Sequence, residues 1–534
     1  MKVKLMGAAR TVTGSCYIIE AAGRRFAIDC GLHQGNEEIE KRNWDVDIYD
    51  PPGIEFILLT HAHMDHAGLI PRLVQKGFRG RIYMTPCTGD LLNIMLLDSA
   101  HIQETEALWK SKKRRRQGET DTAPLYVQKD AMDAFPLFST VTYNEPFSPF
   151  PGLTVVFRDA GHIIGAAMVE LSLIEEGKPL HVVFSGDIGR PSQLIVRDPT
   201  VIEEADVLFM ESTYGNRNHK NEGDSLDELA EAISYSYKRG QKVIIPAFAV
   251  ERTQEMIYSL HLLLKKGRLP DIPIYVDSPL AIQATEIFRH CKKYMDEDAK
   301  RILEDGDDPL KLPRLTYTQS TDESIAINKK EGPAIVISAS GMANAGRIKH
   351  HLRHNLWREG ASIVFVGFQA QGTPGRKIVD GATNVRIFNE DVAVKAKIFT
   401  INGFSGHAGQ TQLMDWFGHF KTRNLKLFLT HGEYMAQKEL AKAIRERFGI
   451  EAAIPDYLEE ITLTPGLQPE VVRFPEKAEP RIDWTYLLSD LKEKLSAIES
   501  RRPDMEKKLW AEQTDLRNRL LDTSKNLAGI ISEI

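Results

Sequence analysis

Cysteine is scarce in this chain of 534 residues, which contains only Cys16, Cys30, Cys87 and Cys291. The four are scattered without a C-x-x-C pair, so the sequence predicts neither a disulfide framework nor a thiolate zinc site. Long apolar runs are also missing, because no segment approaches the ~18 apolar residues of a membrane span. The N-terminus lacks the apolar core of a signal peptide. We therefore expect a soluble, cytoplasmic protein without a membrane partner.

A strong charge of one sign is absent as well. The formal net charge is −6, from 68 basic and 74 acidic side chains, so nucleic-acid affinity would require a local patch. The run from Lys110 to Arg116, in which only Ser111 is uncharged, is one candidate. The Gly-rich segment 341–347 lacks the Lys-Ser/Thr pair of a P-loop, which argues against ATP binding there.

The most informative segment that is present is Leu58–Gly68, which reads L-L-T-H-A-H-M-D-H-A-G. It follows the apolar run Ile54–Leu59, which is typical of a buried strand that ends at a turn. Imidazole and carboxylate groups at this density suit zinc, manganese or iron. A cluster of this kind rarely occurs without a ligand, because buried polar groups without partners are costly. The segment therefore predicts a metal site.

Other candidate ligands also stand at the ends of predicted strands. They are His162, Asp187 and His431, which follow the apolar stretches 153–158, 181–185 and 425–429. Loops at one edge of a sheet can converge, because the sheet fixes where each loop begins. We expect these side chains to join the first cluster.

The order of predicted elements indicates an α/β fold. In residues 1–204, short strands alternate with helices, which favours a layered sandwich. Residues 205–385 contain compact apolar strands separated by helices, beginning with Val207–Met210, and this is typical of a parallel sheet. Residues 386–468 return to the earlier pattern, so the middle domain looks inserted. Residues 469–534 carry two amphipathic stripes separated by Pro503, which predict a helical hairpin that serves packing or a homodimer.

These motifs together resemble the metallo-β-lactamase fold superfamily. The resemblance implies an αββα sandwich and a site for two zinc ions, with manganese as an alternative. It implies that His61, His63 and His162 bind one ion, that Asp65, His66 and His431 bind the other, and that Asp187 bridges them. It also implies that Asp29, in the segment A-I-D-C-G, orients the ligands from behind.

The middle domain narrows this resemblance. Its motifs are F-M-E-S-T-Y-G at 209–215, I-P-A-F-A-V-E-R-T-Q-E at 245–255, V-D-S-P-L-A at 276–281, I-S-A-S-G-M at 337–342 and V-G-F-Q-A-Q-G-T at 366–373, and G-F-S-G-H-A follows at 403–408 in the returning segment. This series is similar to the β-CASP nucleases, the family of the polyadenylation cleavage factor and its bacterial and archaeal relatives. Glu211, His407 and His431 match the family's motifs A, B and C. A histidine at motif C accompanies RNA substrates in that family, so His431 favours RNA over DNA.

The resemblance implies a zinc-dependent RNA phosphodiesterase. A hydroxide held between the metals would attack phosphorus, and His407, positioned by Glu211, would protonate the leaving oxygen. Asp65 would share in catalysis through the metal it binds. We expect single-stranded RNA to be anchored by a set of side chains and backbone groups in the middle domain: Arg252, Ser338, Ser340, Gly341, Arg347 and Arg376.

Three alternatives remain at this point. The chain could be a hydrolase of DNA, a hydrolase of a small thioester or phosphodiester, or an inactive RNA-binding subunit. The inserted domain and the Glu211/His407 pair argue against the small-substrate enzyme. The full set of seven metal ligands argues against the inactive subunit. The sequence does not distinguish an endonuclease from a 5′-exonuclease, nor does it identify the RNA target.

Overall fold

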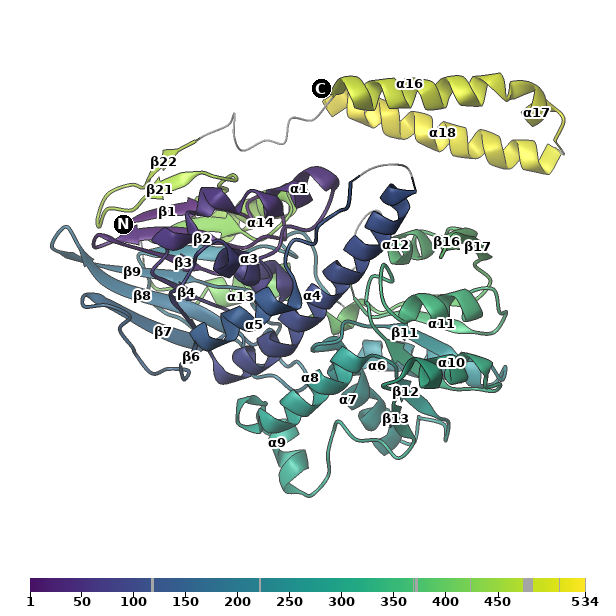
Figure 1. The fold of residues 1–534 in the computed structure, drawn as a ribbon, viewed down its shortest axis with the longest axis horizontal. Helices are drawn as coiled ribbons and strands as arrows, with labels where there is room; N and C mark the ends of the chain where they lie inside the picture. Colours follow the sequence, from purple (N-terminus) through teal and green to yellow (C-terminus); the bar gives the residue numbers. More distant parts are fainter. Residues whose placement is uncertain are drawn as a thin grey trace. The chain divides into compact units, whose positions relative to one another are not determined.

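The computed structural model describes residues 1–116, 120–219, 222–367, 369, 373–422, 424–473, 484–508 and 510–533. The chain forms two compact units, Met1–Ala478 and Glu479–Ile534. Figure 1 shows the large unit as layers of sheet and helix and the small unit as a pair of long helices. The predicted α/β class and the C-terminal helices are confirmed. None of the helices within the described ranges is both long and apolar enough to cross a membrane.

The first sheet of the large unit is mixed and has eight strands, in the order β22-β21-β1-β2-β3-β4-β5-β6. Along the chain these strands are β1 (Lys2–Leu5), β2 (Tyr17–Ala21), β3 (Arg24–Ile28), β4 (Phe56–Leu58), β5 (Arg81–Met84), β6 (Phe138–Thr140), β21 (Glu460–Thr462) and β22 (Glu470–Val472). The N-terminal strand β1 pairs with both β2 and β21, so the end of the large unit returns to its beginning.

The second sheet has six strands, in the order β20-β19-β10-β9-β8-β7. They are β7 (Leu153–Asp159), β8 (Ala167–Glu175), β9 (Lys178–Phe184), β10 (Val207–Glu211), β19 (Lys426–Thr430) and β20 (Ala452–Ala453). The two sheets pack face to face through aromatic side chains. The ring of Tyr17 on β2 lies 5.0 Å from that of Phe184 and 5.6 Å from that of Phe209. Their contact forms the core that fixes the edge where the candidate ligands lie.

The third sheet is parallel throughout and has the order β13-β12-β14-β11-β15-β18. Its strands are β11 (Val243–Pro246), β12 (Ile274–Val276), β13 (Leu315–Tyr317), β14 (Ile335–Ser338), β15 (Ser362–Phe365) and β18 (Lys397–Thr400). The strands β11, β14 and β15 are buried along their whole length, as is usual where helices cover both faces of a parallel sheet. A separate hairpin is formed by β16 (Asn384–Ile387) and β17 (Glu390–Ala393).

Helices cover the sheets and connect their strands. In the lactamase-like part they are α1 (Glu37–Lys41), α2 (Met64–Ala67), α3 (Ile70–Gln75), α4 (Pro86–Arg115), α5 (Gln128–Ala134), α13 (Gln410–Phe417) and α14 (Tyr434–Phe448). Around the third sheet they are α6 (Glu222–Tyr237), α7 (Arg252–Lys265), α8 (Pro279–His290), α9 (Glu297–Glu304), α10 (Thr321–Lys329), α11 (Ile348–Asn355) and α12 (Pro374–Val379). The small unit contains α16 (Trp484–Ser500), α17 (Arg502–Glu506) and α18 (Trp510–Glu533), which Figure 1 draws as the predicted hairpin.

Two strand assignments made from the sequence are wrong. Val207–Met210 was expected to begin the inserted sheet, but β10 pairs with β9 and β19 in the second sheet. Conversely, β18 was expected to belong to the returning segment, but it pairs with β15 in the third sheet. A short buried strand has the same apolar pattern in either sheet, so the pattern could not assign them. The domain boundaries themselves stay predictions.

The expectation that the cysteines form no disulfide is also wrong. Cys87, in the first turn of α4, is bonded to Cys291, which caps the C-terminal end of α8. The two residues are 204 positions apart and belong to different layers of the large unit. Cys16 and Cys30 are free and buried.

Candidate metal centre

One group of candidate ligands forms where β4 and β7 end. The ring nitrogens His61 Nε2 and His63 Nδ1 are 3.1 Å apart, and His162 Nε2 lies 3.2 Å from the same His63 Nδ1. Asp187 Oδ2 is 3.6 Å from both His61 Nε2 and His162 Nε2. Three imidazole nitrogens and one carboxylate oxygen therefore converge on one point.

A second group lies on the other side of Asp187. His66 Nε2 and His431 Nε2 are 3.1 Å apart, and Asp65 Oδ2 is 3.7 Å from His431 Nε2. Asp187 Oδ1 faces this group, at 3.3 Å from His66 Nε2 and 3.5 Å from His431 Nδ1. Asp187 thus directs one carboxylate oxygen to each group, which is the arrangement expected of a bridging ligand.

The hydrogen-bonding capacity of these side chains fits divalent cations. His162 Nδ1 and Asp187 Oδ1 are buried and have no hydrogen-bond partner among the residues that the structure describes. Ring nitrogens that face one another in pairs cannot all be satisfied by the few protons that neutral imidazoles carry. Burial also lowers the pKa of His61 and His162, and lowers that of His63 to about 4, so these rings are neutral and able to ligate at physiological pH. A set of histidine nitrogens and carboxylate oxygens is typical of zinc.

Asp29 supports the centre from behind. Its carboxylate accepts hydrogen bonds from the backbone N–H and hydroxyl of Thr60, at 2.8 and 3.0 Å, and contacts His66 Nδ1 at 2.7 Å. Because Nδ1 of His66 is held in this way, its Nε2 is directed to the second group. This geometry suits the orienting role that the sequence suggested for Asp29.

Glu211 and His407 form a third group at the same edge. Glu211 Oε1 lies 3.1 Å from His407 Nδ1 and accepts a hydrogen bond from the Ile188 N–H at 2.7 Å. His407 Nε2 points toward the centre, 3.9 Å from Asp187 Oδ2. Burial lowers the pKa of His407, but the charges of Glu211 and Asp187 outweigh it and raise that pKa to about 9. A protonated His407 can therefore persist at neutral pH.

Two supporting residues were missed in the sequence. The Thr60 hydroxyl lies 3.0 Å from His61 Nδ1 as well as bonding Asp29, and the Thr213 hydroxyl lies 3.1 Å from His431 Nδ1. Thr60 directly precedes the histidine motif and Thr213 comes two residues after Glu211. Their positions beside motif residues were the available signal, but threonine is so common at strand ends that position alone carries little weight.

Comparison with known proteins identifies the family of this chain. Residues 9–84 match the metallo-beta-lactamase superfamily, residues 253–378 match the Beta-Casp domain and residues 391–455 match the Zn-dependent metallo-hydrolase RNA specificity domain. Ribonuclease TTHA0252 of Thermus thermophilus is 35% identical over 84% of this chain and 96% of its own length. The chain belongs to the β-CASP family of metallo-β-lactamase-fold hydrolases.

More distant relatives in the same family include transcription termination factors named FttA. The protein from Methanosarcina mazei is 28% identical over 87% of this chain and 72% of its own length. The protein from Thermococcus kodakarensis is 31% identical over 78% of this chain and 63% of its own length. The family match confirms the predicted zinc-dependent, RNA-directed metallo-hydrolase.

Three of the residues predicted to anchor RNA form hydrogen bonds with other groups of the protein. The Ser338 hydroxyl is buried and donates to the Asp277 carbonyl, and Arg347 donates to the Asp277 carboxylate at 2.7 Å. Arg376 is half exposed and bonds Asp380 at 2.8 Å. These three side chains are held by protein partners in this structure, so an RNA contact would require them to be released.

The other predicted anchors are Arg252, Ser340 and Gly341. Arg252 is buried and pairs with Glu255, which also accepts a hydrogen bond from Arg190 at 3.2 Å. Arg190 follows Asp187 by three residues, so this cluster connects helix α7 of the inserted domain to the loop that carries Asp187. The Ser340 hydroxyl donates to Asn344 Oδ1 at 2.7 Å, and the Gly341 carbonyl accepts a hydrogen bond from Gln369.

Proposed function

We propose that this β-CASP hydrolase cleaves RNA phosphodiester bonds at a centre for two zinc ions, with His407 as the general acid. The observation that carries the proposal is the position of Asp187, whose two oxygens face two separate ligand groups while His407 approaches from a third side. His61, His63 and His162 would hold one ion and Asp65, His66 and His431 the other. The nitrogen-rich donor set favours zinc, although manganese would also bind.

The residues of this chain have separate tasks in the proposed reaction. Bound zinc supplies Lewis acidity toward a phosphoryl oxygen and lowers the pKa of coordinated water. His407 Nε2 faces the centre and donates its proton to the leaving oxygen, while Glu211 fixes the ring through Nδ1. Asp29 and Thr60 hold the ligand rings in one orientation. Preorganised groups of this kind cost little reorganisation when charge develops.

We propose an additional RNA contact on the C-terminal end of α4. The basic run was expected after a helix, but α4 continues through Arg115. Ala107 and Ser111 are buried, and the Ser111 hydroxyl bonds the backbone of Thr122. Since a helix turns 100° per residue, Trp109, Lys112 and Arg116 lie on the opposite face. Trp109 is 71% exposed there, and an exposed ring among cations suits base stacking and phosphate pairing.

The α4 contact is tested by charge reversal. Lys112→Glu with Arg116→Glu should weaken single-stranded RNA binding and reduce the slope of log K against log salt by about 1 to 2. The control is Lys178→Glu with Lys266→Glu, two exposed lysines that lie on β9 and at the C-terminal end of α7. Filter binding at four salt concentrations measures both slopes. An unchanged slope in the α4 variant would reject the contact.

The proposed activity is tested with zinc-loaded protein and an internally labelled RNA blocked at both ends, beside matched single-stranded DNA. Discrete fragments from blocked RNA mean an endonuclease, whereas cleavage only after a 5′ end is freed means a 5′-exonuclease. If neither nucleic acid is cleaved but a small thioester is hydrolysed, the proposed function is wrong. Binding of RNA without any hydrolysis would instead support an inactive subunit.

Two further parts of the proposal concern setting and assembly. A cytoplasmic location is supported by the names of the archaeal relatives, which are transcription termination factors. A homodimer is supported by exposed apolar side chains on α16 and α18, among them Leu488, Leu495 and Leu520. Sedimentation of the full chain, compared with a chain ending at residue 473, measures whether these helices associate.

A further inference from the structure

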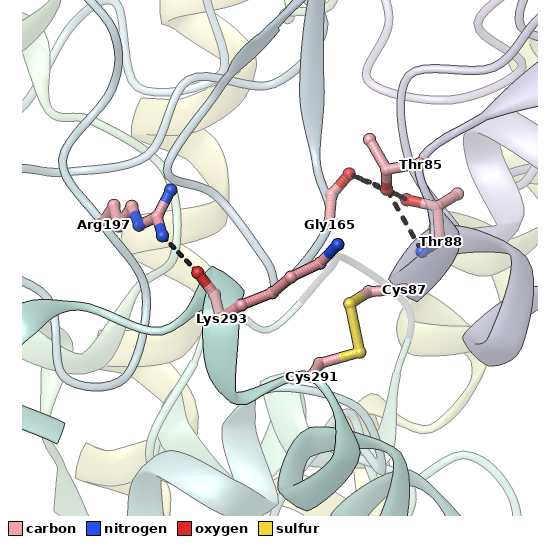
Figure 2. Close-up of a disulfide and its surroundings, with 7 residues drawn as sticks. All are labelled: Thr85, Cys87, Thr88, Gly165, Arg197, Cys291 and Lys293. Atoms are coloured by element: carbon pink, nitrogen blue, oxygen red, sulfur yellow. Dashed lines mark hydrogen bonds between the residues drawn. A yellow bond between two sulfur atoms is a disulfide. The ribbon is translucent and has the colours of Figure 1, made fainter. Parts of the chain in front are cut away.

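The disulfide between Cys87 and Cys291 joins the lactamase-like part of the large unit to the inserted domain. Figure 2 shows the bond between the first turn of α4, in the lactamase-like layers, and the end of α8, beside the third sheet. Both cysteines are buried, and the helices that carry them are packed against each other. The bond therefore crosses the interface between the lactamase-like part and the inserted domain.

Non-covalent contacts hold the same corner of the interface. Arg197 donates to the backbone carbonyls of Lys293 (Figure 2) and Met295, and the Asp296 N–H donates to the Ile195 carbonyl at 2.8 Å. Contacts of this type can break and re-form as domains move, since interfaces inside a chain usually permit relative motion. A covalent bond cannot break and re-form in this way. The disulfide therefore decides whether this corner of the interface can separate.

Hydrogen bonds hold the loop beside the metal centre close to the disulfide. The loop that follows His162 is held by the Thr85 and Thr88 hydroxyls, which donate to the Gly165 carbonyl at 2.6 and 2.9 Å (Figure 2). Neither bond involves sulfur. Reduction of the Cys87–Cys291 bond should therefore leave the His162 loop in place.

Little of the metal centre is exposed in this structure. His61, Asp187 and Glu211 are almost fully buried, and Asp65 and His407 expose only 25% and 20% of their side chains. A phosphodiester in an RNA chain brings a sugar and a base on each side. The proposal below therefore requires the lactamase-like part and the inserted domain to move apart before RNA can reach these groups.

We propose that Cys87 and Cys291 form a redox-controlled tether that limits the entry of RNA to the metal centre. The proposal rests on the proposed function. In the oxidised state the S–S bond keeps α4 and α8 together. Two molecules of a small thiol, such as glutathione, reduce it: the S–S bond breaks, Cys87 and Cys291 each gain one electron and one proton, and the two small thiols become one disulfide. The domains then separate far enough to admit RNA.

The test uses the full-length, zinc-loaded protein in two states. One sample is oxidised with glutathione disulfide and the other reduced with a phosphine, and alkylation followed by mass spectrometry verifies the state of the pair. We expect the oxidised sample to cleave RNA roughly 5- to 100-fold more slowly, the usual range of coupling between sites. Hydrolysis of methyl p-nitrophenyl phosphate, a diester with only a methyl group on one side, and the zinc content should be equal in the two samples. The variant Cys87→Ser/Cys291→Ser should cleave RNA at the reduced rate in both reagents.

Equal RNA cleavage in the two verified states would overturn the tether. Loss of zinc together with both activities on reduction or oxidation would also overturn it, because the bond would then act on the metal centre. If neither state cleaves RNA, the proposed function fails, and hydrogen exchange decides the tether separately. Reduction should speed amide exchange in residues 195–197 and 291–296, and unchanged exchange there would reject the proposal even if Cys87→Ser/Cys291→Ser does not fold.

Discussion

Two buried aspartates of this protein stand in similar places and have opposite surroundings. Asp187 follows β9 in the lactamase-like part, and Asp277 follows β12 in the inserted domain. Asp277 accepts hydrogen bonds from Thr318 and Arg347 on one oxygen, at 2.6 and 2.7 Å, and from Ser324 and His351 on the other, at 2.5 and 2.6 Å. These bonds hold the pKa of Asp277 well below its usual range against the effect of burial.

Asp187 has no comparable set of donors. Within the described part of the chain its Oδ1 makes no hydrogen bond, and imidazole nitrogens lie 3.3 to 3.6 Å from its two oxygens. A buried carboxylate that is fully hydrogen-bonded needs nothing more, whereas one that faces a cluster of imidazole nitrogens on two sides can bind cations with them. The difference between the clusters thus separates a structural network from a binding site.

The largest expected effect is the difference between substituting Asp187 and substituting Asp277. Asp187→Ala should lose zinc and lower RNA cleavage by more than about 10³-fold, beyond the loss of a single transition-state contact. Asp277→Ala should keep its zinc but lose about 3 to 5 kcal/mol of unfolding free energy, because Arg347 and His351 lose a buried partner. Metal analysis, cleavage rate and urea unfolding measure the three quantities. Zinc loss in folded Asp277→Ala would erase the distinction.

The next prediction compares two histidines, each paired with a buried acid. His407→Ala should reduce RNA cleavage by about 10²- to 10⁴-fold while the zinc content is unchanged, because a general acid is lost. His351→Ala removes a histidine that lies 2.6 Å from Asp277 and is completely buried. It should lower the unfolding free energy without changing the turnover of the folded fraction. Wild-type cleavage by His407→Ala would refute the assignment.

The Glu211–His407 pair also predicts a change in pH dependence. A general acid works while it is protonated, so the rate falls as pH rises through its pKa. The negative charge of Glu211 raises the pKa of His407, so Glu211→Gln should move the alkaline limb of kcat/KM to lower pH by about 1 to 3 units. A profile from pH 5 to 10 at saturating zinc measures the limb. A limb that stays in place would show that another group supplies the proton.

The sequence predicted the centre better than its surroundings. The metal-ligand candidates lie together because each follows a strand whose end lies at the same edge. Such motifs are local, so one chain shows them. The sheet to which Val207–Met210 belongs depends on which strand it pairs with, and no local pattern records that.

The contacts that the sequence did not predict are mainly those between residues far apart along the chain. Cys87 and Cys291 lie 204 residues apart, and their spacing carries no signal of the interface that brings them together. Arg347 has the charge and position of a phosphate anchor, yet its guanidinium is bound to Asp277 from a strand 70 residues earlier. Side-chain chemistry alone does not reveal which partner a charged group meets first in the folded chain.

The smallest expected effects concern two threonines, Thr213 beside the metal centre and Thr318 beside Asp277. The Thr213 hydroxyl lies 3.1 Å from His431 Nδ1, and the Thr318 hydroxyl donates to Asp277 Oδ1 at 2.6 Å. Thr213→Val keeps the side-chain shape but frees the ring of His431, so zinc affinity should fall about 10-fold, the lower end for groups that orient a ligand. Thr318→Val should leave zinc affinity unchanged and cost about 1 kcal/mol of unfolding free energy, since Asp277 keeps its other donors. Competition with a zinc chelator and urea unfolding, applied to both variants, measure these values. If both variants lose only stability, Thr213 is structural, and His431 is then oriented by its backbone and neighbouring rings instead.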